Sequence, residues 1–185
     1  MSSPQTRIPP GRLRELGPIN WAFAKLSART VKVPEMHLFT TLGQRRVLYW
    51  TFLFYGARLL RGRLPRIDTE LVILRVAHLR GCEYELQHHR RIARKAGLDA
   101  DLQAAIFAWP QRLDPVDNRL TVRQQALLAA TDEFVRDRTV AADTWQQLAT
   151  HLDRRQLIEF CLLASQYDGL AATISALGIP LDQPR

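Results

Sequence analysis

From Pro65 onward the sequence consists of one helical pattern after another, and this succession constrains the fold more than any other feature. Leu71, Leu74 and Leu79 share one face of an expected helix, and a second helix is expected over residues 82–96. No segment alternates apolar and polar residues with a period of two, which is the pattern of a half-buried strand. The sequence therefore predicts an all-α protein.

Short polar residues mark where several of these helices begin. Thr121 and Gln124 form a capping-box pair, in which each side chain bonds to the backbone of the other residue. Single caps are expected at Asp68, Asp99 and Asp153.

The length of 185 residues fits one compact domain with a terminal extension. Residues 1–12 contain three prolines and are predicted to form a flexible N-terminal segment. One all-α domain is expected over residues 13–185. Within it, residues 13–64 would supply extra N-terminal helices, including a nearly all-apolar one over residues 44–60, and residues 65–182 would form the core.

The net charge of +8 comes entirely from the N-terminal third of the chain. Residues 1–66 contain 12 lysines and arginines against 2 acidic residues, whereas the remainder is nearly neutral. A basic arm can bind nucleic acid or anionic lipid, but the chain has neither zinc-finger spacing nor an aromatic–basic RNA-binding motif. We expect no nucleic-acid partner and interpret the basic third as a solvated or subunit-contacting surface.

Three features favour a cytoplasmic location without a membrane partner. Cys82 and Cys161 are too few for a disulfide framework, and the N-terminus lacks the apolar core of a secretory signal. The most apolar stretch, Val47–Leu60, is too short to span a bilayer and contains Arg58. We interpret it as a buried or subunit-facing helix, and we therefore expect a homo-oligomer.

The segment from Glu70 to His89 holds the residues that can carry chemistry. Cys82, Glu85 and His89 are spaced i, i+3 and i+7 and therefore share one face of a helix. Cys82 lies near the N-terminus of that helix, where the macrodipole favours a thiolate. If the preceding helix packs against it as a hairpin, the Glu70 carboxylate can meet His89 or Glu85. A thiol, a carboxylate and an imidazole suffice for acid–base chemistry.

These residues resemble the motif of the alkylhydroperoxidase D and carboxymuconolactone decarboxylase superfamily: Glu, eleven residues, Cys, two residues, Cys, three residues, His. Glu70, Cys82 and His89 match its first, second and fourth members, and Glu85 stands where the second cysteine would be. The resemblance covers roughly residues 36–182. It implies an alkylhydroperoxidase D-like helical fold with extra N-terminal helices, assembled as trimers or hexamers.

The missing second cysteine separates the functions that the resemblance implies. Glu85 cannot form the disulfide of the peroxidase branch. The run from Tyr84 to His89, YELQHH, is similar to the decarboxylase branch, which removes carbon dioxide from a lactone acid without a metal or organic cofactor. We expect such a decarboxylase-like enzyme acting on a small carboxylated lactone or similar acid. A thiol-dependent peroxidase using Cys82 with an external reductant, and a non-catalytic oligomeric binding protein, remain alternatives.

In the expected mechanism His89 is the general acid–base group, and Glu70 or Glu85 orients it. An arginine would hold the carboxylate of the substrate. The residues expected to bind the substrate are Tyr84, His88, Arg75 and Arg90. No metal is expected, because a di-iron bundle needs two Glu-x-x-His elements and the chain has only the one from Glu85 to His88.

Overall fold

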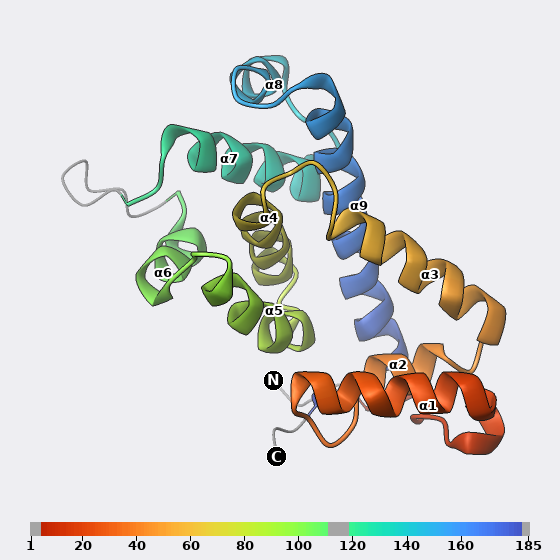
Figure 1. Ribbon diagram of the computed structural model, residues 1–185. Coiled ribbons are helices and arrows are strands. Elements are labelled where there is room, and N and C mark those ends of the chain that lie inside the picture. Colours follow the sequence, from red (N-terminus) through yellow and green to blue (C-terminus); the bar gives the residue numbers. More distant parts are fainter. Residues whose placement is uncertain (1–4, 111–118, 183–185) are drawn as a thin grey trace. The chain divides into compact units, whose positions relative to one another are not determined.

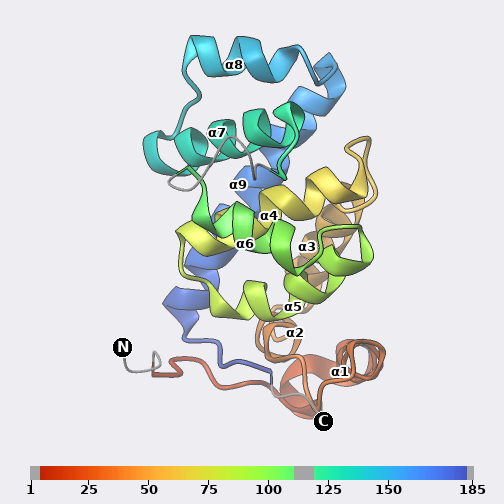
Figure 2. The ribbon, with the colours of Figure 1, turned by 90° about the vertical axis from the view of Figure 1, so that its left-hand side faces the viewer.

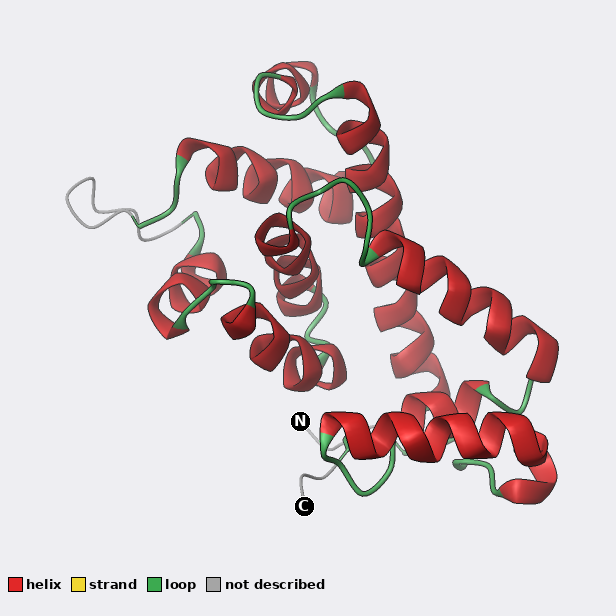
Figure 3. Ribbon diagram, in the orientation of Figure 1, coloured by secondary structure: helices red, strands yellow, loops and turns green. Residues whose placement is uncertain are grey.

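The computed structural model describes residues 5–110 and 119–182, and all regular structure within these ranges is helical (Figure 3). The all-α prediction is confirmed. In chain order the helices are α1 (Leu13–Val31), α2 (His37–Leu42), α3 (Arg46–Leu59), α4 (Arg66–Leu79), α5 (Glu83–Lys95), α6 (Ala100–Ala108), α7 (Val122–Asp137), α8 (Ala142–Ala149) and α9 (Arg154–Leu177) (Figure 1). Within the described ranges, none of them is both long enough and apolar enough to cross a membrane.

The chain divides into two compact units. The N-terminal unit consists of residues 1–57 together with residues 172–185, and the core unit consists of residues 58–171. Of the segment predicted to be flexible, residues 1–4 lie outside the described ranges, and residues 5–12 precede α1 without regular structure. All of the candidate site residues belong to the core unit.

The N-terminal unit is built around a cluster of aromatic rings. Asn20 joins two parts of this unit, since its amide donates to the Gly43 carbonyl at 2.9 Å and its oxygen accepts from the Trp50 indole at 2.9 Å. Neighbouring ring centroids lie 5.1 to 6.3 Å apart. The rings belong to Phe23, Phe39, Tyr49 and Trp50.

The core unit is organised around α4, which packs against α5, α6 and α7 in both perpendicular views (Figures 1 and 2). Every residue from Asp68 to Ala77 is buried. A helix covered on all sides must be apolar around most of its circumference, and the run LVIL with Val76 and Ala77 meets that requirement. The polar residues that α4 does bury therefore need specific partners.

The helix starts agree with the expected caps in three places and differ in one. The Thr121–Gln124 box forms, and Asp99 and Asp153 accept from backbone N–H groups of their helices. The expected cap at Asp68 is wrong. Its buried carboxylate accepts from the Arg123 guanidinium of α7 at 2.8 Å, because at this depth it faces a neighbouring helix rather than its own first turn.

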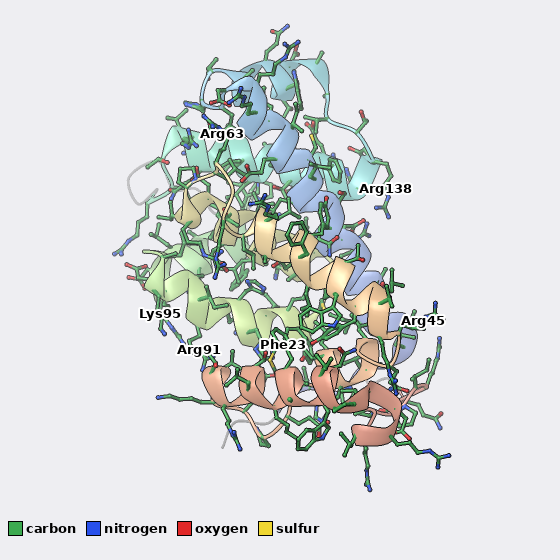
Figure 4. All side chains as sticks on the ribbon, turned by 45° about the vertical axis from the view of Figure 1, so that its right-hand side comes forward. Phe23, Arg45, Arg63, Arg91, Lys95 and Arg138 are labelled. Atoms are coloured by element: carbon green, nitrogen blue, oxygen red, sulfur yellow. The ribbon has the colours of Figure 1, made fainter. Side chains whose placement is uncertain are left out.

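The loop before α4 is fixed by the side chain of Glu159 from α9. The Glu159 carboxylate accepts from the backbone N–H groups of Arg63 at 2.7 Å and Leu64 at 3.0 Å (Arg63 is labelled in Figure 4). A Cβ on Gly62 would lie 2.1 Å from a Glu159 oxygen, so a larger residue there would displace the carboxylate. This contact holds the backbone just before α4, the helix that carries Glu70.

Candidate active site

A tight connection joins α4 to α5 and places their residues face to face. Gly81 adopts φ 60°, the left-handed conformation that glycine reaches without strain, and the Cys82 N–H donates to the Ala77 carbonyl at 2.8 Å. Cys82 thereby becomes the residue immediately before α5. α4 packs against α5, so the hairpin that a contact of Glu70 with His89 or Glu85 requires is present.

Glu70 is fully buried, and each of its carboxylate oxygens has one charged or ionisable partner. His89 Nδ1 lies 2.8 Å from Glu70 Oε2, and Arg66 Nη2 lies 2.7 Å from Glu70 Oε1. The ring of Tyr167, from α9, meets the His89 ring edge-on with centroids 5.2 Å apart. The structure thus brings Glu70 and His89 together across the two helices.

This arrangement assigns a role to each nitrogen of His89. An ionised Glu70 can only accept a hydrogen bond, and beside it Nδ1 of His89 would be the nitrogen that carries the proton. In the neutral imidazole the lone pair is then on Nε2. His89 as a whole is 9% exposed. The ring is oriented to accept a proton at Nε2 and to return it.

Among the carboxyl groups that the structure describes, Glu85 has the pKa that is given the largest rise. It is 3% exposed, and neither of its oxygens has an ordinary hydrogen-bond partner among the described residues. Burial raises the pKa of Glu85 to about 8; the adjacent Cys82 thiol, a weak donor, opposes the rise, and the charge of Asp168 adds to it. Glu85 is therefore mostly a neutral, proton-carrying acid at pH 7.

Cys82 does not become the thiolate that its position at a helix start suggested. Burial, followed by the charge of Glu85, raises the pKa of the Cys82 thiol to about 12. The backbone N–H groups of Glu85 and Tyr84 lower that pKa but are outweighed. Cys82 is only 7% exposed, so the cost of desolvating its thiolate exceeds the stabilisation that the helix N-terminus offers.

Asp168 supplies a fixed negative charge on the α9 side of the site. Its carboxylate pairs with both Arg80 and Arg138 (Arg138 is labelled in Figure 4). Burial acts to raise the pKa of Asp168, but the hydrogen bonds from the two arginines outweigh it and hold that pKa below the ordinary value. Glu85 thus has an ionised carboxylate in its surroundings, which helps keep it neutral.

Four other residues expected at the site have contacts of their own. Arg75 donates to Asp132 at 2.6 and 2.8 Å and to the carbonyls of Ile106 and Trp109 at 2.9 Å each. Arg90 lies over the Phe107 ring at 5.0 Å. The other two pack against each other with ring centroids 5.0 Å apart; they are Tyr84 and His88.

The contacts of Arg75 predict a structural role. We expect Arg75→Met to lower the free energy of unfolding by about 3–5 kcal/mol, because it leaves Asp132 and two carbonyls without their partner. Arg90→Met, at an exposed position, should cost less than about 1 kcal/mol. Urea unfolding of both variants measures this difference. If Arg75→Met is as stable as the original chain, the structural role is contradicted and Arg75 is again a candidate for binding the substrate.

The site contains three residues that the sequence analysis did not assign to it. Arg66 precedes Glu70 by four residues, and this i,i+4 spacing was the available signal. Tyr167 and Asp168 reach the site from α9, about eighty residues further along, and no local pattern marks them. Within the described ranges, no group of three or more metal-ligating side chains gathers.

The fold matches several solved structures along nearly its whole length. A Ralstonia eutropha protein described as an alkylhydroperoxidase AhpD core and peroxidase-related protein aligns with a TM-score of 0.77 and 16% identity, covering 97% of this chain and 92% of that one. A Silicibacter peroxidase-related protein aligns with a TM-score of 0.75 and 13% identity, covering 99% of this chain and 95% of that one. A cysteine-to-alanine variant of the debrominase Bmp8, in complex with 2,3,4-tribromopyrrole, aligns with a TM-score of 0.76 and 15% identity. The alignment covers 97% of this chain and 94% of that one. These matches establish the alkylhydroperoxidase D-like fold.

Residues 46–132 match the model of the carboxymuconolactone decarboxylase family, and this segment contains Glu70, Cys82, Glu85 and His89. That segment of the chain is similar to the carboxymuconolactone decarboxylase family. Comparison with curated proteins gives no match. Where the redox motif has its second cysteine, the chain carries the buried Glu85.

Proposed function

We propose that the chain is a cofactor-free acid–base enzyme that decarboxylates, or carries out a related proton transfer on, a small carboxylated lactone or similar acid. One observation carries this proposal. Where the redox motif has its second cysteine, the chain has Glu85, whose pKa of about 8 leaves it protonated at neutral pH. A general acid works best when its pKa lies near the working pH, and burial has moved Glu85 into that range.

The proposed steps follow from the protonation states of the side chains. The bond between the substrate carbon and its carboxylate breaks, carbon dioxide leaves, and the bonding electron pair passes into the neighbouring carbonyl system. Glu85 delivers its proton to the resulting carbanion carbon. His89 Nε2 then carries a proton from water to the Glu85 carboxylate, while Glu70 keeps the ring in place.

The chemistry of the bound ligand in one structural neighbour supports a small ring compound as substrate. The Bmp8 variant holds a tribromopyrrole. The test is direct: the purified protein is incubated with a set of small lactones bearing one carboxylate, and carbon dioxide release is measured. We expect release to be fastest below pH 8 and to fall as Glu85 ionises. If no lactone acid is turned over, the proposal is contradicted and a binding role on this scaffold is favoured.

A thiol peroxidase is the second candidate, because Cys82 occupies the first cysteine position of the motif. In that reaction the thiolate attacks a peroxide oxygen, giving a sulfenic acid and an alcohol, and an external dithiol then reduces the sulfenic acid. The first step requires a thiolate, and the pKa of about 12 makes one rare at neutral pH.

Cys82 reactivity therefore separates the two candidates. We expect hydroperoxide at pH 7 to oxidise Cys82 at least about 100-fold more slowly than it oxidises a thiol in an unfolded chain. The reason is the low fraction of thiolate at Cys82. Mass spectrometry of the intact protein, with Cys82→Ser for assignment, measures this rate. Rapid oxidation confined to Cys82 and reversed by a dithiol would favour the peroxidase.

We also propose that the protein forms a homo-oligomer. The α3 face leaves large apolar side chains in water, with Val47 83% exposed and Phe54 66% exposed. Apolar patches of this kind mark contact surfaces in soluble proteins. We expect light scattering to give the mass of a trimer or hexamer, and Val47→Glu combined with Phe54→Glu to reduce it. A monomer at micromolar concentration would contradict this proposal.

A further inference from the structure

We propose that Arg66 is a positioning residue that sets the proton arrangement of His89 through Glu70. This inference rests on the proposed function only for its consequence in catalysis, because the proton arrangement exists without substrate. Arg66 does not touch His89 in the structure; it acts on the carboxylate that does.

The geometry gives Glu70 two partners of different kinds. Arg66 binds Oε1 at 2.7 Å, and His89 Nδ1 lies 2.8 Å from Oε2. A further contact fixes the guanidinium itself, since Arg66 Nη1 donates to the Leu60 carbonyl at 2.8 Å. The carboxylate is therefore held in one orientation with Oε2 directed at the imidazole.

Burial makes the cation necessary. Glu70 is 0% exposed, and a carboxylate in that setting is strongly disfavoured unless a positive charge compensates it. Arg66 is the arginine that pairs with it and is always charged. Arg66 favours the ionised form of Glu70, which can only accept a hydrogen bond, and beside that form the proton of His89 lies on Nδ1 and the lone pair on Nε2.

Removing the cation should reverse this arrangement. A Glu70 that takes up a proton becomes a donor, and its O–H would then bond to a lone pair on His89 Nδ1. The remaining imidazole proton would move to Nε2, so His89 would present a donor where it now presents an acceptor. The two tautomers give distinct ¹⁵N chemical shifts for the two ring nitrogens, which makes the switch visible.

The alternative is an ordinary i,i+4 pair on a helix surface, contributing roughly 0.2–0.5 kcal/mol to helix stability and nothing to His89. The exposure of the two partners argues against it. The Arg66 side chain is 39% exposed, but its partner is wholly buried, so the pair connects an interior charge to the surface rather than joining two solvated side chains.

The test compares ¹⁵N-histidine spectra of the full chain at neutral pH, with signals assigned through His89→Gln. We expect the Nδ1–H tautomer in the original chain, in Arg66→Lys, and in the control Arg61→Gln, which removes an exposed arginine from the same segment. Arg66→Gln should show the Nε2–H tautomer as the major form.

An Arg66→Gln variant that folds and keeps the Nδ1–H tautomer would overturn the proposal. If that variant does not fold, the original chain and Arg66→Lys decide: an Nε2–H tautomer in either would overturn it. Because these spectra need no substrate, they remain informative if no lactone acid is turned over. Turnover, where found, should fall at least about 10-fold in Arg66→Gln and recover in Arg66→Lys.

Discussion

Turnover of a lactone acid should fall by about 100- to 10,000-fold when His89 is replaced by glutamine. This is the range that a positioned general acid–base group contributes, and glutamine cannot exchange a proton at neutral pH. The side chain of glutamine can still hydrogen-bond to Glu70, so we expect the variant to fold. Carbon dioxide release and circular dichroism, measured on the same preparation, test both statements.

His78→Gln provides the matched control for this experiment. His78 is exposed near the C-terminal end of α4, where its ring packs against Phe107 with centroids 5.1 Å apart. We expect its turnover to stay within about 2-fold of the original. A folded His89→Gln variant with undiminished turnover would remove His89 from the mechanism.

Stability should fall as the pH rises from about 4.5 to about 8, and Glu85→Gln should abolish most of this dependence. The pKa of Glu85 is raised in the folded chain to about 8 from an ordinary value of 4.5. Between these values the folded state holds the Glu85 proton and the unfolded state releases it. The folded state therefore binds more protons, and the free energy of unfolding decreases with rising pH.

The size of this effect follows from the linkage relation. One proton corresponds to about 1.4 kcal/mol of unfolding free energy per pH unit across this window. Glu85→Gln keeps the shape of the neutral acid and cannot ionise, so it should be more stable than the original chain at pH 8 and similar to it at pH 5. Urea unfolding at both pH values measures the crossover. Parallel pH profiles of the two proteins would show that Glu85 is ionised in the folded state.

The sequence allowed a hairpin in which Glu70 meets either His89 or Glu85, because both contacts depend on local spacing, and the structure shows the contact with His89. Gly81 turns the chain between the end of α4 at Leu79 and the start of α5 at Glu83, and the motif spacing then brings the carboxylate to the imidazole. The resemblance to a known superfamily added the fold and the significance of Glu85. These inferences need only the order of residues along two consecutive helices.

The ionisation state of Cys82 and the partners of Arg75 and Asp68 could not be predicted in the same way. The position of Cys82 before a helix favours a thiolate, yet burial in the folded core raises the pKa of the thiol instead. Arg75 was expected to bind substrate, but its guanidinium pairs with Asp132, which lies 57 positions away. Asp68 similarly finds Arg123 on α7. In each case the deciding contact is long-range.

The ionisation of Glu85 tests most directly whether this is an acid–base site. The carboxyl ¹³C signal of Glu85, assigned through Glu85→Gln, can be followed by NMR from pH 4 to pH 10 in the folded protein. We predict a neutral carboxyl at pH 7 and a midpoint near 8. A midpoint near 4.5, with an ionised Glu85 at pH 7, would contradict its role as the proton donor.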